Sequence, residues 1–316
     1  MSGDVGIPVA VTARTEVAEH VVEFELRHPD GNALPDWRPG AHIDVATGDR
    51  MVRQYSLCGE PDDRGAYRIA VLKQPGGRGG SVWLHDRLRE GDRLTIRGPR
   101  NRFPLERATS YVFLAGGIGV TPFLPMIRQA AKDGAEWVLH YGGRNRAAMA
   151  YADELGSTDA GRVRLTPADE YGFIDIEAAV AARPAESLVY CCGPEPMIAA
   201  AESVCARRGL RLRTERFSPK DSPTSTVNSD FTVHIASTGM EITVPADRSL
   251  VDVLTEAGID VLTSCEEGTC GTCETTVLSG RPDHRDCVLT DEERAANDRM
   301  LICVSRSQTP QLVLDL

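Results

Sequence analysis

The chain has 316 residues, which is more than one hydrophobic core usually organises and enough for two or three domains. Its composition, 41% hydrophobic and 26% charged, is typical of a globular protein, and no stretch approaches the roughly 18 apolar residues of a membrane helix. The formal net charge of −11 argues against a protein that neutralises nucleic-acid phosphates, and the first residues lack the pattern of a secretory signal.

Residues 1–105 are predicted to form an antiparallel β-barrel. Short alternating or apolar runs are separated by turn-rich clusters such as HPDGN and QPGGRGG, a pattern that favours a small barrel or sandwich. The strands expected here include Val21–Leu26, His42–Val45, Tyr67–Leu72 and Arg93–Ile96.

Residues 106–217 are predicted to form an α/β domain. Strands are expected at Tyr111–Ala115, Trp137–Tyr141, Arg162–Thr166 and Leu188–Cys192. Helices are expected at Pro122–Lys132, Ala147–Leu155, Ile174–Ala182 and Pro196–Arg207. This alternation predicts a parallel sheet with helices on both faces.

Residues 218–230 are polar and rich in Ser, Thr and Pro, which is typical of a linker between domains. Residues 231–316 are predicted to form a third, α+β domain. Its expected elements are strands at Phe231–Ile235, Glu241–Val244 and Glu274–Leu278 and a helix at Leu250–Ala257.

Four of the nine cysteines have the spacing of a metal cluster. Three of them form C-x₄-C-x₂-C, and the fourth follows 30 residues later, which is the plant-type ferredoxin spacing for a [2Fe–2S] cluster; they are Cys265, Cys270, Cys273 and Cys303. Two irons need four thiolates, and Gly268 and Gly271 allow the tight turn that points N–H groups at the sulfurs. A zinc ribbon would need a second C-x₂-C pair. The remaining cysteines, which we interpret as small apolar residues, are Cys58, Cys191, Cys192, Cys205 and Cys287.

Two motifs in the first segment suggest a site for a flat, phosphorylated cofactor. The tetrapeptide Arg53-Gln54-Tyr55-Ser56 combines a guanidinium with an aromatic ring, although such a strand is common by itself. After Ala70-Val71-Leu72-Lys73, the turn Gly79-Gly80-Ser81 precedes a helical start, where free N–H groups and the helix dipole attract phosphate.

Two further loops lie at strand ends of the α/β segment. The first, Gly116-Gly117-Ile118-Gly119-Val120-Thr121-Pro122, lies between a strand and a helix, where a pyrophosphate binds. The second, Cys192-Gly193-Pro194-Glu195-Pro196-Met197, ends a strand and opens another helix. Arg144 and Arg146 follow the second strand, where two arginines could indicate the 2′-phosphate of NADPH.

The order of segments and these motifs resemble the phthalate dioxygenase reductase family, the class IA oxygenase reductases, which includes vanillate demethylase reductases. The resemblance covers nearly the whole chain. It implies that Tyr55 packs on a flavin ring, Ser56 hydrogen-bonds its N5 edge and Arg53 pairs with phosphate. It also places Thr121 near the flavin and Phe217 against its ring, and it favours FMN over FAD and NADH over NADPH. The cofactor-binding residues so predicted are Arg53, Gln54, Tyr55, Ser56, Ala70, Leu72, Gly79, Gly80, Ser81, Gly116, Gly117, Gly119, Thr121, Pro122, Arg144, Cys192, Gly193, Pro194, Met197 and Phe217.

The expected function is a reductase that takes electrons from NADH through FMN and a [2Fe–2S] cluster to a separate Rieske-type oxygenase or demethylase. Its redox cofactors would carry the chemistry, so we expect no catalytic residue. A reductase for a cytochrome P450 and a stand-alone flavin reductase are the alternatives. We expect a cytoplasmic monomer.

The acidity of the chain is concentrated in residues 231–316, which carry 15 acidic and six basic side chains, a net charge of −9. This segment is either a solvated face or a docking surface for a basic patch on the oxygenase.

Overall fold

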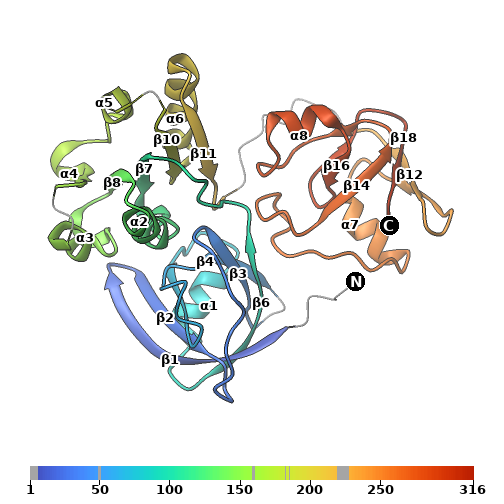
Figure 1. The fold of residues 1–316 in the computed structure, drawn as a ribbon. Coiled ribbons are helices and arrows are strands. Elements are labelled where there is room, and N and C mark those ends of the chain that lie inside the picture. The colour runs from blue at the N-terminus through green and yellow to red at the C-terminus, as the bar shows by residue number, and fades with distance from the viewer. Residues whose placement is uncertain (1–5, 49–50, 159–160, 182, 185, 219–227) are drawn as a thin grey trace. The chain divides into compact units, whose positions relative to one another are not determined.

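A computed structural model describes residues 6–48, 51–158, 161–181, 183–184, 186–218 and 228–316 (Figure 1). The chain divides into two compact units, residues 1–215 and residues 216–316. Most of the predicted linker 218–230 falls on residues 219–227, outside the described residues. Among the helices of the described residues, none is long and apolar enough to cross a membrane.

The first unit begins with an antiparallel sheet of six strands, in the order β4-β3-β6-β1-β2-β5. A bridge between Leu57 and Ile69 joins the two edges, so the sheet curls on itself as the predicted barrel requires. Its strands are β1 (Ile7–Ala18), β2 (Val21–Arg27), β3 (Ala41–Ala46), β4 (Val52–Ser56), β5 (Tyr67–Leu72) and β6 (Arg93–Asn101). Alternate apolar residues, such as Phe24 and Leu26, fill the interior, where Leu84 of α1 (Gly80–Arg87) joins them.

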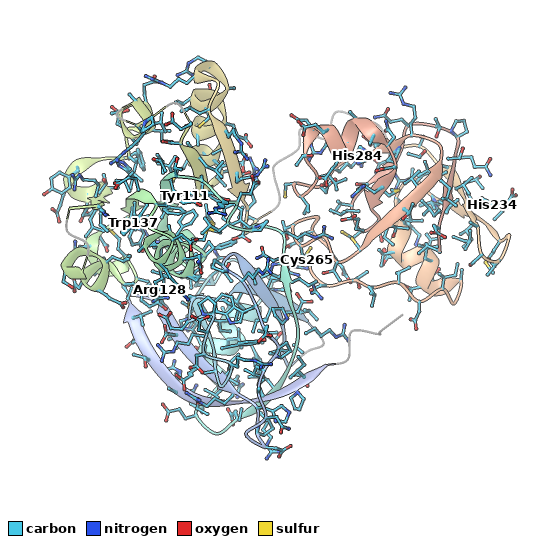
Figure 2. The ribbon with its side chains drawn as sticks, viewed as in Figure 1. Tyr111, Arg128, Trp137, His234, Cys265 and His284 are labelled. Atoms are coloured by element: carbon cyan, nitrogen blue, oxygen red, sulfur yellow. The ribbon has the colours of Figure 1, made fainter. Side chains whose placement is uncertain are left out.

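The second sheet of this unit is parallel, with the strand order β11-β10-β7-β8-β9. Its strands are β7 (Ser110–Gly116), β8 (Glu136–Gly143), β9 (Val163–Pro167), β10 (Leu188–Cys192) and β11 (Arg211–Glu215). Its helical segments are η1 (Gly117–Val120), α2 (Phe123–Lys132), η2 (Arg146–Ala148), α3 (Ala152–Thr158), α4 (Ala168–Tyr171), α5 (Ile176–Ala181) and α6 (Glu195–Arg208). The paired residues Tyr111 and Trp137 lie inside this layer (Figure 2).

Successive residues of β7 enter two different cores, because a strand points its side chains to opposite faces of the sheet. Tyr111 and Phe113 pack with residues of α2, whereas Val112 and Leu114 pack with residues of α5 and α6. Both faces are therefore covered, which confirms the predicted parallel sheet with helices on each side.

The predicted helix Ala147–Leu155 is correct only in its last turn, from Ala152 to Leu155. The chain forms the short η2 turn, breaks, and starts α3 only at Ala152. Between them Tyr151 adopts a left-handed backbone (φ 60°), and its hydroxyl donates a hydrogen bond to the Glu23 carboxylate at 2.7 Å. This contact with β2, together with the burial of Met149 and Ala150, overrides local helix propensity. Strands β1 and β11 and helix α4 were not among the expected elements.

The second unit contains a five-stranded sheet in the order β13-β12-β18-β14-β16 and a small β15–β17 pair. Its strands are β12 (Phe231–Ile235), β13 (Glu241–Val244), β14 (Glu274–Ser279), β15 (Pro282–Asp283), β16 (Arg299–Leu301), β17 (Arg306–Ser307) and β18 (Gln311–Leu314). Its helices are α7 (Leu250–Glu256) and the unpredicted α8 (Asp291–Ala296). The cysteine loop leads into β14, and Cys303 follows β16, so the two neighbouring strands β14 and β16 position the fourth thiol beside the other three.

Candidate cofactor-binding site

The four predicted ligand cysteines come together in the second unit, where each is at most 8% exposed (Figure 2 labels Cys265). The thiol of Cys265 shares hydrogen bonds with those of Cys270 and Cys303, and the thiol of Cys273 shares one with Cys303. Residues 30 positions apart in the sequence thus form one buried group of sulfurs.

Backbone N–H groups of the loop point at these sulfurs. The amides of Glu267 and Thr269 donate to Cys265 Sγ at 3.3 and 3.4 Å, and the amide of Thr272 donates to Cys270 Sγ at 3.4 Å. Gly268 and Gly271 make this possible, because both have a positive φ (69° and 75°) that other residues rarely adopt. Buried thiols that accept several N–H bonds are suited to be thiolate ligands, so the loop fits a [2Fe–2S] cluster.

The cysteine spacing differs from that of a zinc ribbon, which would need a second C-x₂-C pair. Among the described residues, no three His, Cys, Asp or Glu side chains are arranged to hold a single metal ion. A two-iron cluster needs a wider ligand set, with two thiolates on each iron. The thiol of Cys287 donates to the carbonyl oxygen of Gly268 at 3.4 Å.

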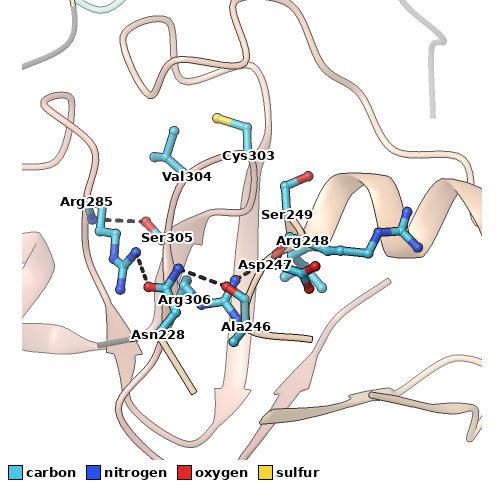
Figure 3. A pocket seen from close by; sticks show the side chains of 11 residues that line it. Asn228, Ala246, Asp247, Arg248, Ser249, Arg285, Cys303, Val304, Ser305 and Arg306 are labelled. Carbon is cyan, nitrogen blue, oxygen red and sulfur yellow. Dashed lines mark hydrogen bonds between the residues drawn. The ribbon is translucent and has the colours of Figure 1, made fainter. Parts of the chain in front are cut away.

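Cys303 also borders a cavity of about 250 Å³ (Figure 3). Three guanidinium groups line it, and each is engaged by the protein. Arg306 donates to the carbonyls of Arg248, Ser229 and Pro245; Arg285 pairs with Asp283 and donates to Asn228; Arg248 pairs with Glu256. This network anchors the turn that carries Cys303.

In the first unit, Arg53 lies against the start of α1. A Cβ atom added at Gly80 would approach Arg53 Cγ to 2.7 Å and Nε to 2.9 Å, so a side chain there would displace this arginine from its present position. Gly79, at the N-cap, has a φ of 89°, and no side chain caps the helix. A guanidinium beside uncapped N–H groups fits a phosphate. Ser81 Oγ accepts a hydrogen bond from the backbone N–H of Gln74 at 3.1 Å.

The other predicted residues of β4 and β5 lie in or against the wall of the barrel. The Gln54 amide donates to the buried Asp44 carboxylate at 3.0 Å, and Asp44 also pairs with Arg100, so Gln54 is held inside the barrel wall. Tyr55 is half-buried against the barrel core, and burial raises its pKa. On β5, Ala70 is buried and Leu72 is half-buried.

Ser56 contacts Glu215, which was not among the predicted site residues. Its hydroxyl lies 3.5 Å from Glu215 Oε2, to which it can donate. Burial raises the pKa of Glu215 to about 8, against the lowering effect of the Ser56 hydroxyl. Burial and the charge of Glu215 also raise the pKa of Cys192, which pairs with Glu215 across β10 and β11. Three elements thus bring Ser56, Cys192 and Glu215 together.

The two predicted nucleotide loops are in direct contact. A Cβ atom at Gly116 would lie 2.5 Å from Pro194 Cδ and 2.9 Å from Met197 Sδ, and one at Gly119 would lie 2.3 Å from the carbonyl oxygen of Cys192. A Cβ atom at Gly193 would lie 2.9 Å from Gly116 Cα. The loops that follow β7 and β10 can approach this closely only because these residues are glycines. Gly117 has a φ of 55°, Pro122 is the N-cap of α2, and the buried Thr121 donates to the Ile118 carbonyl.

The remaining two predicted residues are exposed. Arg144 follows β8, near Arg146, which pairs with Asp153 at 2.6 Å. Phe217 is 44% exposed and belongs to the second unit.

Comparison with known proteins assigns each part of the chain to a domain model. Residues 8–104 match an oxidoreductase FAD-binding domain, residues 113–203 an oxidoreductase NAD-binding domain, and residues 233–308 a 2Fe-2S iron-sulfur cluster binding domain. Together these define an iron–sulfur flavoprotein oxidoreductase.

Whole-length relatives narrow this class. The chain is 42% identical to the phenoxybenzoate dioxygenase subunit beta of Ectopseudomonas oleovorans, over 95% of this chain and 94% of that one. The solved structure of a phthalate dioxygenase reductase matches 99% of this chain and 98% of that one, at 36% identity and a TM-score of 0.72. The chain belongs to the family of oxygenase reductases that includes phthalate dioxygenase reductase, as its motifs predicted.

A cytochrome P450 monooxygenase is similar as well. The structure of an intact type IV self-sufficient cytochrome P450 monooxygenase matches 98% of this chain at 40% identity and a TM-score of 0.91. The chain spans about two-fifths of that protein, 41% of its length.

Proposed function

We propose that this protein takes electrons from NADH and delivers them singly, through its flavin and [2Fe–2S] domains, to the oxygenase component of a Rieske-type system. The observation that carries the proposal is the buried group of four thiols with N–H groups pointing at it, in the same chain as a nucleotide-binding sheet. A bound flavin would accept two electrons as hydride and release them one at a time, which the cluster requires.

The residues of the first unit would bind and orient these groups. Arg53 and the start of α1 would hold the flavin phosphate, and Tyr55 would support the ring. Ser56 would donate a hydrogen bond to the N5 edge of the flavin, and Glu215 would lie on the other side of the Ser56 hydroxyl. The contacting loops Gly116–Thr121 and Cys192–Met197 would bring the pyrophosphate and nicotinamide to the same edge. Phe217 is proposed to cover the flavin ring.

FMN is the flavin we propose. One guanidinium beside one uncapped helix start forms a compact site for a single terminal phosphate, in keeping with the resemblance. Denatured protein should therefore release FMN on chromatography, and a peak of FAD would contradict the proposal.

NADH is the donor we propose, because acidic residues stand beside the arginines that follow β8. Asp169 donates its backbone N–H to the Arg144 carbonyl at 3.2 Å, and both Asp169 and Glu170 are exposed. Asp153 neutralises Arg146. The 2′-phosphate of NADPH would meet two carboxylates here, whereas the ribose hydroxyls of NADH can donate to them.

The cluster residues give the decisive test. Cys265→Ser, Cys270→Ser, Cys273→Ser and Cys303→Ser should each abolish the [2Fe–2S] absorption and EPR signal, because each removes one of the four thiolates. NADH should still reduce the flavin, while reduction of the oxygenase component should be lost. Cys287→Ser is the matched control and should keep the cluster. Loss of the cluster in Cys287→Ser with retention in Cys303→Ser would overturn the ligand assignment.

The similarity to the self-sufficient P450 supports a second candidate, a reductase for a cytochrome P450. The two candidates are distinguished by measuring how fast the reduced protein passes electrons to a purified Rieske oxygenase and to a purified P450 in parallel. A stand-alone flavin reductase would instead reduce neither the oxygenase nor the P450, although NADH would still reduce its flavin.

We propose that the acidic second unit docks transiently on a basic patch of the oxygenase and that the reductase acts as a monomer. Glu266 is exposed within the cluster loop, directly after the ligand Cys265, and Glu267 follows it. Charge-guided, weak association suits a carrier that must release its partner after each electron.

A further inference from the structure

Two large aromatic side chains are exposed on the loop that follows β9. Tyr171 ends α4 and is 71% exposed, and Phe173 is 93% exposed. Gly172 between them has a φ of 75°, so the chain turns sharply at this point. Phe173 is the most exposed large apolar side chain of the described residues and cannot be explained as core packing.

This loop lies at the carboxyl edge of the parallel sheet, beside the loop that follows β8. The Asp169 amide donates to the Arg144 carbonyl at 3.2 Å, and a Cβ atom at Gly142 would lie 3.1 Å from Ile174 Cδ1. The aromatic side chains therefore project from a segment that is fixed at both ends against the end of β8. Ligands of such sheets bind outside this edge.

The strand order β11-β10-β7-β8-β9 places the successive loops in a row. The Cys192–Met197 loop follows β10, the Gly116–Thr121 loop follows β7, Arg144 follows β8 and the aromatic pair follows β9. β9 is two strands away from β7, a distance of about 10 Å. A dinucleotide with its nicotinamide at β10 and its pyrophosphate at β7 would extend its adenosine half over β8 and β9.

The exposed side chain of Arg144 supports this orientation of the dinucleotide along the sheet edge. It is exposed, and within the described part of the chain it forms no ion pair, in contrast to Arg146. An unpaired guanidinium on the loop next to the one that carries two exposed aromatic side chains suits a ligand with both a phosphate and a flat base.

We propose that the adenine ring of NADH packs against Phe173, that Tyr171 forms a second wall, and that Arg144 binds the adenosine-side phosphate. This inference rests on the proposed use of NADH and adds the residues that hold its adenine. Phe173 is a binding residue for the half of the donor that does not react.

The test is anaerobic stopped-flow reduction of the flavin by NADH. Phe173→Ala should raise the apparent Kd for NADH about five- to a hundredfold, the usual effect of losing a base-stacking aromatic side chain. The limiting rate of flavin reduction should stay unchanged, because the nicotinamide site is intact. Phe173→Trp should retain tight binding and Phe173→Leu should not. Tyr171→Ala should have a smaller effect than Phe173→Ala.

Reduced nicotinamide mononucleotide, which lacks the adenylate, separates stacking from a structural effect. It should reduce wild type and Phe173→Ala equally well, while ADP-ribose should inhibit the variant more weakly by the same factor as the loss of NADH affinity. Leu278→Ala, which truncates an exposed apolar residue of the second unit, is the control and should change neither value.

An unchanged Kd for NADH in Phe173→Ala would overturn the inference, as would an equal loss with reduced nicotinamide mononucleotide. Wild-type flavin that NADH fails to reduce would instead overturn the proposed function, and the adenine site with it.

Discussion

The carboxyl group of Glu215 is positioned to make electron entry depend on pH. Because burial raises its pKa to about 8, it is protonated and neutral below that pH and becomes negative above it. Ser56 is proposed to donate to the N5 edge of the flavin, and Glu215 lies directly behind Ser56. A negative charge on Glu215 would therefore oppose the transfer of electrons to the flavin. The rate of flavin reduction by NADH should therefore fall several-fold between pH 7 and pH 9.5.

Glu215→Gln should remove this dependence, because the amide keeps a hydrogen-bond acceptor for Ser56 and cannot ionise. Its rate should stay level over the same pH range. Stopped-flow profiles of both proteins at saturating NADH provide the measurement. A variant with the same decline as wild type would show that another group titrates.

The residue scale also shows what the sequence can and cannot predict about the site. Cys265, Cys270 and Cys273 were predictable because a cluster loop is local in sequence and its spacing is dictated by two irons. The pairing of Ser56 with Glu215, 159 residues apart, depends on how the barrel meets the parallel sheet. No local pattern encodes that meeting, and a lone Glu in a strand carries no signal of its own.

At the scale of elements, the two loops after β7 and β10 approach closely because the residues at the contact are glycines, which have no side chain. Gly119→Ala would place a methyl group 2.3 Å from a backbone oxygen, that of Cys192, which cannot move without moving the end of β10. The variant should bind NADH at least tenfold more weakly and reduce the flavin more slowly, as measured by stopped flow. Flavin content should be unchanged, because Arg53 and α1, which are proposed to hold the flavin phosphate, belong to the barrel and not to the parallel sheet.

Gly161→Ala is a control in the turn before β9 of the same sheet, since a Cβ atom there meets nothing within 4 Å. It should behave as wild type. Equal effects of the two substitutions would mean that the loss reflects general destabilisation of the sheet and not the contact between the loops.

The elements that were predicted correctly have strong local signals. Strands Leu188–Cys192 and Phe231–Ile235 agree residue for residue, since both are short apolar or alternating runs bounded by turn residues. α8 was missed although Thr290 and Glu293 form a capping box, because none of its residues is buried and no apolar stripe marks it. The predicted helix Ala147–Leu155 shows the opposite case: its first half consists of good helix formers, but the helix begins only at Ala152, after the residue Tyr151 that contacts Glu23.

At the scale of the whole molecule, the charge is divided between the units. Residues 231–316 carry −9 of the total −11, although they form little more than a quarter of the chain. Within this unit the cluster loop precedes β14 and Cys303 follows β16, at one edge of the sheet, whereas β13 forms the other edge. Acidic residues near the cluster should therefore affect docking more than those on β13.

Charge reversal tests this difference. Glu266→Lys should slow reduction of the oxygenase component several-fold at low ionic strength, because it replaces attraction by repulsion next to the cluster. Glu241→Lys, an equally large charge change on β13 at the opposite edge, should have a much smaller effect. Reduction of the flavin by NADH should be the same in both variants and in wild type.

Salt separates docking from a change in the cluster itself. The attraction between exposed charges is screened beyond about 8 Å at physiological ionic strength, so oxygenase reduction by wild type should slow as salt rises above a few tenths molar. A small uncharged acceptor reduced at the flavin should be much less sensitive. Glu266→Lys should lose most of its difference from wild type at high salt if the residue steers docking. A difference that persists there would mean that Glu266 tunes the reduction potential of the cluster, and equal rates of wild type at low and high salt would remove the docking proposal.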